Sequence, residues 1–419
     1  MRQKHMIAFF GFFGVTNIGN DSTLKAILYH LRQREPQTEL LCITRSPESA
    51  LRLFEIPAMS MDAIYNPDTG INSELGSILI KTFRRIPAEI KRILRAFQEL
   101  RNVERLIIPG TGALVDFGES PTSRPYSLLL WCAVARLSGV QVEFVSVGAN
   151  RIDHPISRFF IFKALRLANY RSYRDADSKE YLKRIGFQCD TDSIYPDLVF
   201  SYPLEAIRGQ RPPTIPPTVV GLGVMGYYGW RDDPVSGASI YQAYIANMSR
   251  FAIWSINQGY KIRFLIGQNK DQRAVNDILS VVTRDINSPD EAIFATMIET
   301  SEELIHAISE TDIVIATRFH NAIFAIMLGR PVITIGYSSK FEALLSDIGL
   351  AGYSQQIEQL DIELLKSQFE SVVQHYVEIQ ELILKKSQRY RQLLDKQYDD
   401  LFPLCQEPDS EKLRQLQVT

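Results

Sequence analysis

The chain has 419 residues, which is more than one ordinary hydrophobic core contains, so its length predicts two globular units. Hydrophobic residues make up 45% of the chain and charged residues 22%, which is ordinary globular usage and excludes a broadly disordered protein. The formal net charge of −2 gives no overall attraction to nucleic acid. We therefore expect no nucleic-acid partner, and expect any anionic ligand to be bound by local cationic side chains.

The first predicted element is a buried strand at residues 6–10. The start of the chain is similar to a signal peptide, but glycines from Gly11 onward interrupt the apolar run too early for a secretory or membrane-spanning segment. The cysteines are Cys42, Cys132, Cys189 and Cys405. They match neither a disulfide framework nor a zinc spacing, so we expect a protein of the reducing cytoplasm without a bound metal.

Short apolar runs then alternate with longer segments of helical period, which is typical of βα units repeated around a mainly parallel sheet. In the first half of the chain these runs lie at residues 6–10, 40–44, 105–108, 142–147 and 170–173. Most of them end in a glycine-containing turn. Because open parallel sheets bind ligands beyond the carboxyl ends of their strands, the pattern predicts a crevice lined by these turns.

An insertion at residues 74–101 separates two of these strands. Its part from 81 to 101 contains seven lysines and arginines but only two glutamates, interleaved with apolar side chains. This spacing predicts a basic amphipathic helix that is broken at Pro87. Two interpretations stay open: contact with an anionic membrane surface or a lipid-linked substrate, and the more ordinary one of a helix face exposed to water.

Residues 208–217 contain four prolines, so we predict that they link an N-terminal lobe of residues 1–207 to a C-terminal lobe of residues 218–356. In the second lobe, strands are predicted at residues 218–222, 261–266, 312–316 and 331–335. Residues 357–406 have a helical apolar stripe and are expected to pack across one lobe or return to the other, followed by a mobile tail at 407–419. The predicted fold is α/β, with two Rossmann-like lobes, a cleft between them and a C-terminal helical segment.

The loop after the first predicted strand is rich in glycine and leads into a helical segment. Backbone N–H groups at a helix start attract a phosphate or a carboxylate, so Asn17, Gly19 and Asp21 are candidates for binding substrate. The alternative is that Asn20 or Asp21 only caps the helix. The glycine spacing differs from that of a dinucleotide site, so a nicotinamide cofactor is not indicated.

Further turns carry Gly110, Gly112 and Gly148, which either let a ligand approach the backbone or simply make tight turns. Arg174 stands at the end of a predicted strand, directly before Asp175, which we expect to be the N-cap of the next helix. The Arg174 guanidinium is suited to binding a carboxylate or a phosphate, and an intramolecular ion pair competes with that role.

The strongest signal lies in the second lobe, where Arg318 and His320 separate a buried strand from a segment that is apolar all round. A charge and an imidazole at such a place cost free energy unless they are paired or used in function. Lys340 follows the next strand, and we expect it near Arg318 if the two strands are parallel neighbours. The other histidines are expected to be structural.

Taken in order, the candidate motifs are residues 14–21, Gly110-Thr111-Gly112, Ser172-Tyr173-Arg174-Asp175 with Ser178, Pro196-Asp197-Leu198-Val199-Phe200, Arg318-Phe319-His320-Asn321-Ala322, and Tyr337 with Lys340. Over roughly residues 6–350 the chain resembles the polysaccharide pyruvyl transferase family in the order of these motifs. The resemblance implies two Rossmann-like lobes similar to those of GT-B glycosyltransferases, with the acceptor on the side of the first lobe and the donor on that of the second. The sequence departs from the family pattern at Asn20, at the short glycine run before Ala113 and at Asn321.

The resemblance also implies a reaction. Pyruvate is transferred from phosphoenolpyruvate to a sugar or a lipid-linked oligosaccharide of exopolysaccharide biosynthesis, usually as a cyclic ketal, with no cofactor and no metal. Arg318, Lys340 and Arg174 are then expected to bind the donor, and His320 to protonate it. The expected location is the cytoplasm or the inner face of the membrane, with residues 81–101 as the peripheral contact.

Two other functions are compatible with the sequence. One is a GT-B-type glycosyltransferase that uses a nucleotide sugar, whose diphosphate Arg318 and Lys340 would neutralise. The other is a carbohydrate-binding or assembly protein without catalytic activity.

Overall fold

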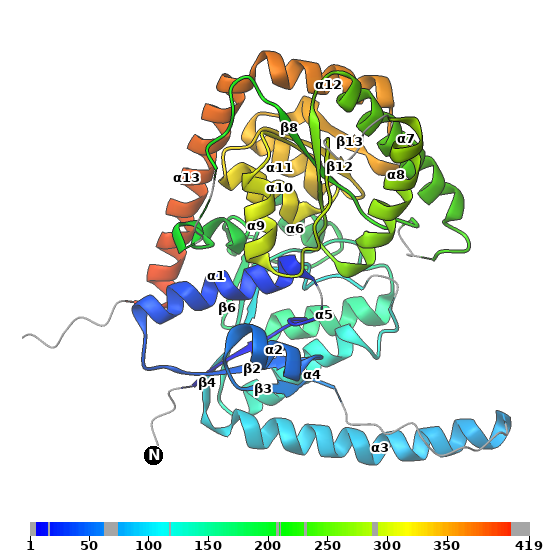
Figure 1. The fold of residues 1–419 in the computed structure, drawn as a ribbon. Helices are drawn as coiled ribbons and strands as arrows, with labels where there is room; N and C mark the ends of the chain where they lie inside the picture. The colour runs from blue at the N-terminus through cyan, green and yellow to red at the C-terminus, as the bar shows by residue number, and fades with distance from the viewer. Residues whose placement is uncertain are drawn as a thin grey trace, which may run out of the picture.

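Two parallel β-sheets, consecutive along the chain, organise the molecule (Figure 1). The computed structural model describes residues 6–15, 17–62, 74–116, 119–206, 209, 211–229, 233–286 and 292–403, with no side chains described at 74–86, 206 and 269. Cys405 and the tail predicted at 407–419 lie outside these residues. The two sheets and their helices confirm the predicted α/β class, whereas the exact lobe and linker boundaries stay predictions.

The first sheet has the strand order β3-β2-β1-β4-β5-β6-β7, and its described pairings are all parallel. Its strands are β1 (Met6–Phe10), β2 (Glu39–Thr44), β3 (Ala58–Ser60), β4 (Val103–Pro109), β5 (Gln141–Val147), β6 (Tyr170–Tyr173) and β7 (Ser193–Ile194). Its helices are α1 (Ile18–Arg34), α2 (Pro47–Phe54), α4 (Arg124–Leu137), α5 (Pro155–Leu167) and α6 (Ala176–Arg184), with short 3-10 helices η1 (Leu100–Asn102), η2 (Leu198–Ser201) and η3 (Leu204–Ala206).

The second sheet has the order β10-β9-β8-β11-β12-β13 and is also parallel. Its strands are β8 (Val219–Gly223), β9 (Lys261–Leu265), β10 (Ile293–Phe294), β11 (Ile313–Ala316), β12 (Val332–Gly336) and β13 (Ser354–Gln356). The helices are α7 (Ala238–Asn257), α8 (Gln272–Asp285), α9 (Ser301–Ser309), α10 (Phe319–Met327) and α11 (Lys340–Ile348), with η4 (Asn269–Asp271), η6 (Ala351–Tyr353) and η7 (Ile357–Gln359). Because β11 and β12 are adjacent and parallel, their carboxyl ends lie side by side, as predicted.

The helix α3 (Glu74–Glu99) corrects one prediction, because it continues through Pro87 instead of breaking there. Proline removes one helix hydrogen bond at a cost of about 3 kcal/mol, but the turns after it are fixed by burial against the lobe. Ala96 is fully buried, and the buried Arg92 donates from Nη2 to Ser127 Oγ at 2.9 Å. Arg92 is therefore a packing residue rather than part of a solvated basic face. Figure 1 shows α3 lying along the end of the first lobe.

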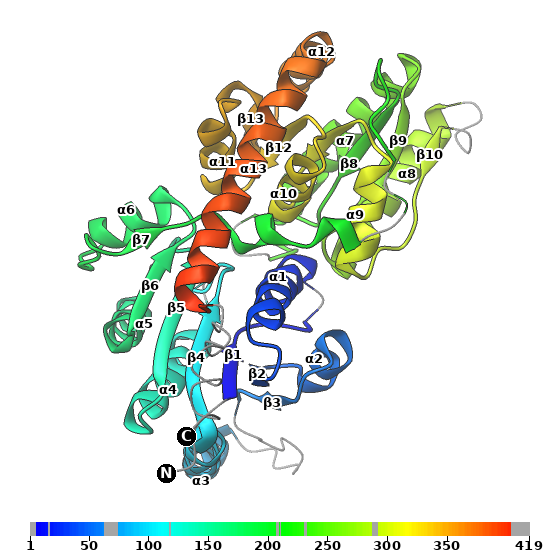
Figure 2. The same cartoon turned by 90° about the vertical axis from the view of Figure 1, so that its left-hand side faces the viewer.

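The C-terminal segment consists of α12 (Ile362–Gln374) and α13 (Tyr376–Leu401), and α13 returns to the first lobe (Figure 2). Gln397, which is fully buried, accepts a hydrogen bond from Ser146 Oγ at 3.0 Å and donates to Tyr170 Oη at 3.1 Å and Ser172 Oγ at 2.9 Å. Arg105 of β4 donates to the carbonyl of Leu401 at 2.8 Å. The second of the two predicted courses of this segment is confirmed.

An apolar core also joins the two lobes. Leu24 of α1 belongs to the same buried cluster as Phe324 of α10. The Tyr202 ring packs edge to face on Phe324 with 5.8 Å between centroids. The hydroxyls of Ser22 and Ser301 share a buried hydrogen bond of 2.8 Å. None of the described helices combines the length and apolar character needed to cross a membrane.

Candidate active site

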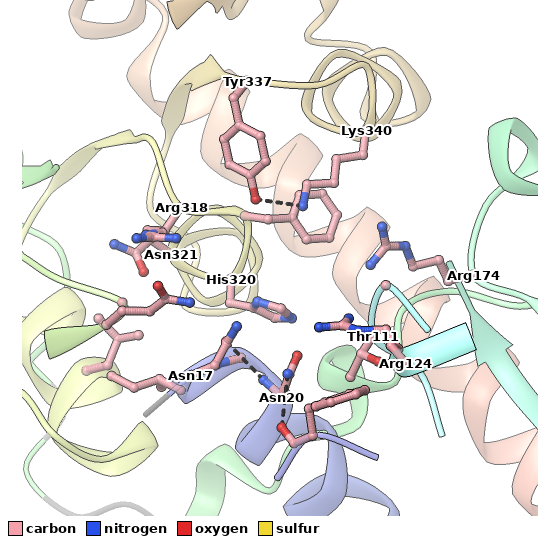
Figure 3. Close-up of a pocket in the computed structure, with 18 residues that line it drawn as sticks. Asn17, Asn20, Thr111, Arg124, Arg174, Arg318, His320, Asn321, Tyr337 and Lys340 are labelled. Carbon is pink, nitrogen blue, oxygen red and sulfur yellow. Dashed lines mark hydrogen bonds between the residues drawn. The ribbon is translucent and has the colours of Figure 1, made fainter. Parts of the chain in front are cut away.

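A cavity of about 160 Å³ lies between the lobes, where α1, α10 and the start of α11 meet (Figure 3). Its wall carries the cations Arg124, Arg174, Arg318 and Lys340 together with His320. Among the described residues no carboxylate lines it. The cations belong to both lobes, so the cavity is formed only where the two lobes meet, and its charge suits an anionic ligand.

The start of α1 forms one wall of the cavity and corrects the predicted cap. The N-cap is Asn17, not Asn20 or Asp21, because Asn17 Oδ1 accepts from the backbone N–H groups of Gly19 at 3.1 Å and Asn20 at 3.3 Å. Gly19 lies directly against His320. A Cβ atom at Gly19 would be 1.8 Å from His320 Nδ1, so glycine is required here for contact between the lobes.

Asp21 does not line the cavity. Its carboxylate accepts from the backbone N–H of Gly14 at 2.7 Å, where Gly14 has a positive φ of 71°. Burial raises the pKa of Asp21 to about 6, even though the Gly14 hydrogen bond and Lys25 lower it. The structure therefore gives Asp21 the role of fixing the loop that leads into α1.

The predicted glycines differ in position. Gly112 lines the cavity, whereas Gly110 lies behind it with a φ of 48°, and a Cβ atom there would be 2.5 Å from Thr23 Cγ2. Gly148 packs under the Arg174 guanidinium, where a Cβ atom would be 2.6 Å from Cζ. The absence of a side chain at Gly148 therefore makes room for the Arg174 guanidinium. Gly148 is not one of the described residues that line the cavity.

Arg174 lies at the end of β6 and combines both predicted roles. It lines the cavity, and it also pairs with Asp175 at 3.2 Å and with Asp197 at 3.5 Å. Its guanidinium lies 5.1 Å from the centroid of the Phe319 ring. Asp175 accepts from Ser178 N at 2.6 Å, which confirms it as the N-cap of α6.

Arg318 is the N-cap residue of α10 and is held by Asp271. Asp271 was not among the residues predicted from the sequence. Arg318 Nε donates to Asp271 Oδ2 at 2.9 Å, and Nη2 donates to Oδ1. Asp271 is fully buried and also accepts from the backbone N–H groups of Gly226 at 3.2 Å and Gln268 at 3.1 Å. Burial opposes the charge on Arg318, but Asp271 outweighs it and raises the pKa of the guanidinium.

Lys340 and Tyr337 form a polar pair on the wall opposite the start of α1 (Figure 3). Lys340 Nζ donates to Tyr337 Oη at 3.0 Å and lies 4.9 Å from the Phe319 ring centroid. No described carboxylate is within ion-pair distance of Lys340. Burial lowers the pKa of Lys340, and Arg174 and Arg318 add to the effect over the opposing influence of Tyr337. For Tyr337, burial raises the pKa, but Lys340 and Arg318 outweigh it and the pKa is lowered.

His320 lies in the first turn of α10 and points toward the centre of the cavity (Figure 3). Its Nε2 has no hydrogen-bond partner among the described residues. Burial lowers the pKa of His320 to about 4, opposed by Asp197 and reinforced by Lys340, Arg174 and Arg318. The imidazole is therefore neutral at pH 7 while the cavity is empty, and bound negative charge would raise its pKa.

The match to a family model covers most of the residues that build this cavity, although Phe12 and Lys340 lie outside it. The model of polysaccharide pyruvyl transferases matches residues 17–339, which is more than half of the chain. The chain belongs to the polysaccharide pyruvyl transferase family. It is therefore a transferase, and the predicted resemblance is confirmed.

Solved structures place the transferase in a GT-B-like fold. The UDP-GlcNAc 2-epimerase of Neisseria meningitidis bound to UDP-GlcNAc has a TM-score of 0.55 at 11% identity, covering 93% of this chain and 99% of that one. The S. aureus MnaA–UDP structure has a TM-score of 0.57 at 10% identity, covering 90% of each chain. Anabaena Alr3699/HepE in complex with UDP scores 0.55 at 11% identity, covering 94% and 100%. At such identities the likeness shows the fold alone, and no curated protein matches the sequence.

Several residues that line the cavity received no role from the sequence, among them Arg124, Asn321 and Tyr337. Arg124 begins α4, pairs with Glu119 at 3.1 Å and lies 4.0 Å from the Phe12 ring centroid. Asn321 is fully buried, and neither its amide nitrogen nor its oxygen has a partner among the described residues. Tyr337 was part of a predicted motif with Lys340, but no role in binding or catalysis was assigned to it. Apolar runs and glycine turns carry no signal for such residues, since contacts between distant segments define them. The described residues contain no group of three that could hold a metal ion.

Proposed function

We propose that this transferase moves pyruvate from phosphoenolpyruvate to a sugar of a polysaccharide or its precursor, forms a pyruvate ketal and releases phosphate. The observation that supports it best is the small cavity walled by four cations and a histidine, with no carboxylate among its described lining residues. Phosphoenolpyruvate carries a phosphate and a carboxylate, and both are strong partners for guanidinium and ammonium groups.

Three of the four cations have an assigned role in this proposal. Arg318 comes pre-oriented by Asp271 and binds one anionic group of the donor. Arg174 and Lys340, which share contact with the Phe319 ring, bind the other. Neither cofactor nor metal is part of this reaction.

His320 is the proposed general acid. Its Nε2 has no partner in the protein and is available to the donor, whose charge raises its pKa. The protonated imidazole gives its proton to the C3 methylene, C2 becomes oxocarbenium-like, and a sugar hydroxyl attacks C2. The C2–O bond to phosphate then breaks, and a second hydroxyl closes the ketal. The hydroxyls release two protons, of which one restores His320 and the other leaves with phosphate.

A lipid-linked acceptor would bring the transferase to the inner face of the membrane, with residues 81–101 as the contact. Ile90 and Leu94 are one helical turn apart on α3 and remain 52% and 57% exposed, next to the exposed Lys91. Such a surface favours anionic lipid. Vesicles of phosphatidylglycerol should pull down the wild type and release a variant with Ile90→Ser and Leu94→Ser, whereas equal sedimentation of both proteins would argue against this contact.

A glycosyltransferase that uses a nucleotide sugar is the second candidate, because structures of similar fold were solved with UDP or UDP-GlcNAc. The cavity taken alone, at about 160 Å³, is smaller than the roughly 300–1,000 Å³ that is usual for sites of larger ligands. A catalytically silent binding protein would have no use for a buried imidazole nitrogen without a partner.

The test is incubation with phosphoenolpyruvate and a panel of sugar acceptors, followed by phosphate release and mass spectrometry for the pyruvyl group. His320→Ala should bind phosphoenolpyruvate as the wild type does but lose transfer by about 10²–10⁴-fold, the usual contribution of a general acid. His375→Ala, at an exposed histidine between α12 and α13, is the matched control and should keep full activity. Full transfer by His320→Ala would refute the assigned acid, and nucleotide release from a sugar nucleotide would favour the second candidate.

A further inference from the structure

A second and larger cavity lies beside the first. It has a volume of about 470 Å³ and is bounded by α6, the turn before η2, α11 and α13. Figure 2 shows α6, α11 and α13 on the same side of the molecule. Arg174, Phe319 and Lys340 line both cavities, so these three side chains form a common wall between them.

The two cavities differ in the chemistry of their walls. Beyond the common wall, the larger cavity is lined by aromatic rings of Tyr195, Phe200 and Tyr390, and by the apolar side chains of Leu344 and Leu393. It also carries carboxylates, including Asp177 and Asp197, which the described wall of the first cavity lacks. Negative charge here would repel a trianionic donor, whereas carboxylates accept hydrogen bonds readily from hydroxyl groups.

Asp197 is a buried carboxylate of this cavity that lies beside the common wall. It is only 4% exposed, lines the larger cavity and uses Oδ1 to accept from Val199 N at 3.1 Å. Its Oδ2 accepts no hydrogen bond from the described residues, although Arg174 Nη1 lies 3.5 Å away. Asp197 therefore keeps an oxygen with capacity to accept a hydrogen bond beside Arg174, which belongs to the common wall.

We propose that the larger cavity is the acceptor subsite and takes an uncharged sugar ring. The apolar C–H face of the sugar packs on the aromatic side chains, and its hydroxyls donate to the carboxylates of the cavity, among them Asp177 and Asp197. This assignment rests on the proposed function, because the donor must occupy the neighbouring cavity. The common wall of Arg174, Phe319 and Lys340 then brings the attacking hydroxyl next to the donor, and wall charge directs each substrate to its own cavity.

Ala343→Trp tests the subsite by filling it from α11. Ala343 lines the larger cavity but not the described wall of the first, and Glu342→Trp puts the same ring at an exposed neighbouring position of the helix. Binding of benzyl glycosides of glucose, galactose and mannose is measured by saturation-transfer NMR, and binding of phosphoenolpyruvate by calorimetry. We expect Ala343→Trp to weaken the glycoside by at least about tenfold with unchanged phosphoenolpyruvate affinity, and Glu342→Trp to behave as the wild type.

Asp197→Asn is a second variant that keeps an oxygen for the Val199 N–H but removes the charge. It should weaken glycoside binding by roughly tenfold or more, as expected for a hydrogen bond to a charged group. Glycoside affinity unchanged in both Ala343→Trp and Asp197→Asn, or no glycoside bound by the wild type, would overturn the subsite. Loss of phosphoenolpyruvate binding by the wild type would instead contradict the proposed function, so the two failures are distinguishable.

Discussion

Arg318 and Asp271 form a two-point ion pair beneath the first cavity, with Nε and Nη2 of the arginine both donating to the carboxylate. Asp271 is fully buried, and its oxygens are further held by backbone N–H groups. The guanidinium therefore has a fixed orientation before any ligand arrives. Pre-orientation reduces the entropy that a side chain loses on binding, and it leaves the remaining guanidinium N–H groups free to bind an anionic ligand.

Asp271→Asn should destabilise the transferase strongly. The substitution leaves the mostly buried guanidinium of Arg318 without its counter-charge, and removing one partner of a buried pair costs about 3–5 kcal/mol. Urea unfolding monitored by circular dichroism measures the loss. Asp285→Asn, at an exposed aspartate at the end of α8, is the control and should change stability little. Equal unfolding midpoints for the two variants would show that the pair is not a structural support.

Arg318→Lys separates charge from geometry. Lysine keeps the positive charge but cannot make the two parallel hydrogen bonds, so we expect phosphoenolpyruvate to bind roughly 10–100-fold more weakly, the range for losing one charged hydrogen bond. Calorimetric titration gives the dissociation constant. Arg284→Lys, on the exposed face of α8, is the matched substitution and should bind as the wild type does. Retained affinity in Arg318→Lys would mean that charge alone is sufficient.

His320 predicts a pH dependence of stability. Its pKa is lowered from 6.5 to about 4 by burial, so below pH 6.5 the unfolded chain binds a proton that the folded protein does not. The contribution of His320 is therefore fully present above pH 6.5 and is lost as the pH falls toward 4, by at most about 3 kcal/mol. His320→Gln should show a smaller loss of unfolding free energy between pH 7 and pH 5 than the wild type. Parallel losses in the two proteins would contradict the depressed pKa.

Tyr337→Phe removes the hydroxyl that accepts the hydrogen bond from Lys340 Nζ at 3.0 Å. Lys340 then loses its anchor, and we expect the KM for phosphoenolpyruvate to rise about three- to tenfold, which matches the roughly 0.5–1.5 kcal/mol of one hydrogen bond. The kcat should change less than the KM. Tyr353→Phe removes a hydroxyl bonded to Ser371 at 3.0 Å in the same lobe, and serves as the control. A fall in kcat alone would assign Tyr337 to the chemical step instead.

Gln397→Leu tests the connection between α13 and the first lobe. The substitution leaves Ser146, Tyr170 and Ser172 short of buried hydrogen-bond partners. We expect a loss of at least about 2 kcal/mol in unfolding free energy, since each unsatisfied group costs about 1–3 kcal/mol. Gln392→Leu, at an exposed position of the same helix, should be close to neutral. Differential scanning calorimetry compares the two, and equal midpoints would show that the contact adds no stability.

The sequence predicted those parts of the fold that local patterns encode. Long apolar runs such as Met6–Phe10 and Gln141–Val147 are central strands of the first sheet. Their own apolar composition is sufficient to predict them as buried strands. The edge strands Ser193–Ile194 and Ser354–Gln356 escaped prediction, because they are two and three residues long and largely polar. Their pairing depends on a neighbouring strand rather than on their own composition.

The site was only partly predictable for a related reason. Arg318, His320 and Lys340 follow buried strands, so their convergence at one edge follows from a parallel sheet. The partner of Arg318 does not, because Asp271 lies 47 residues away and has no local pattern to mark it. The capping role of Asn17 was also missed, since three neighbouring polar side chains compete for the same N–H groups and only the backbone geometry decides among them.

The return of α13 to the first sheet has a consequence for synthesis on the ribosome. The hydroxyls of Ser146 and Ser172 meet Gln397 only after 225 or more further residues have been added, by sequence separation. During translation the first lobe emerges without this helix and exposes the surface that it will cover. Completion of that lobe therefore waits for the synthesis of α13, and an interruption after the second sheet would leave the first lobe without the helix that covers it.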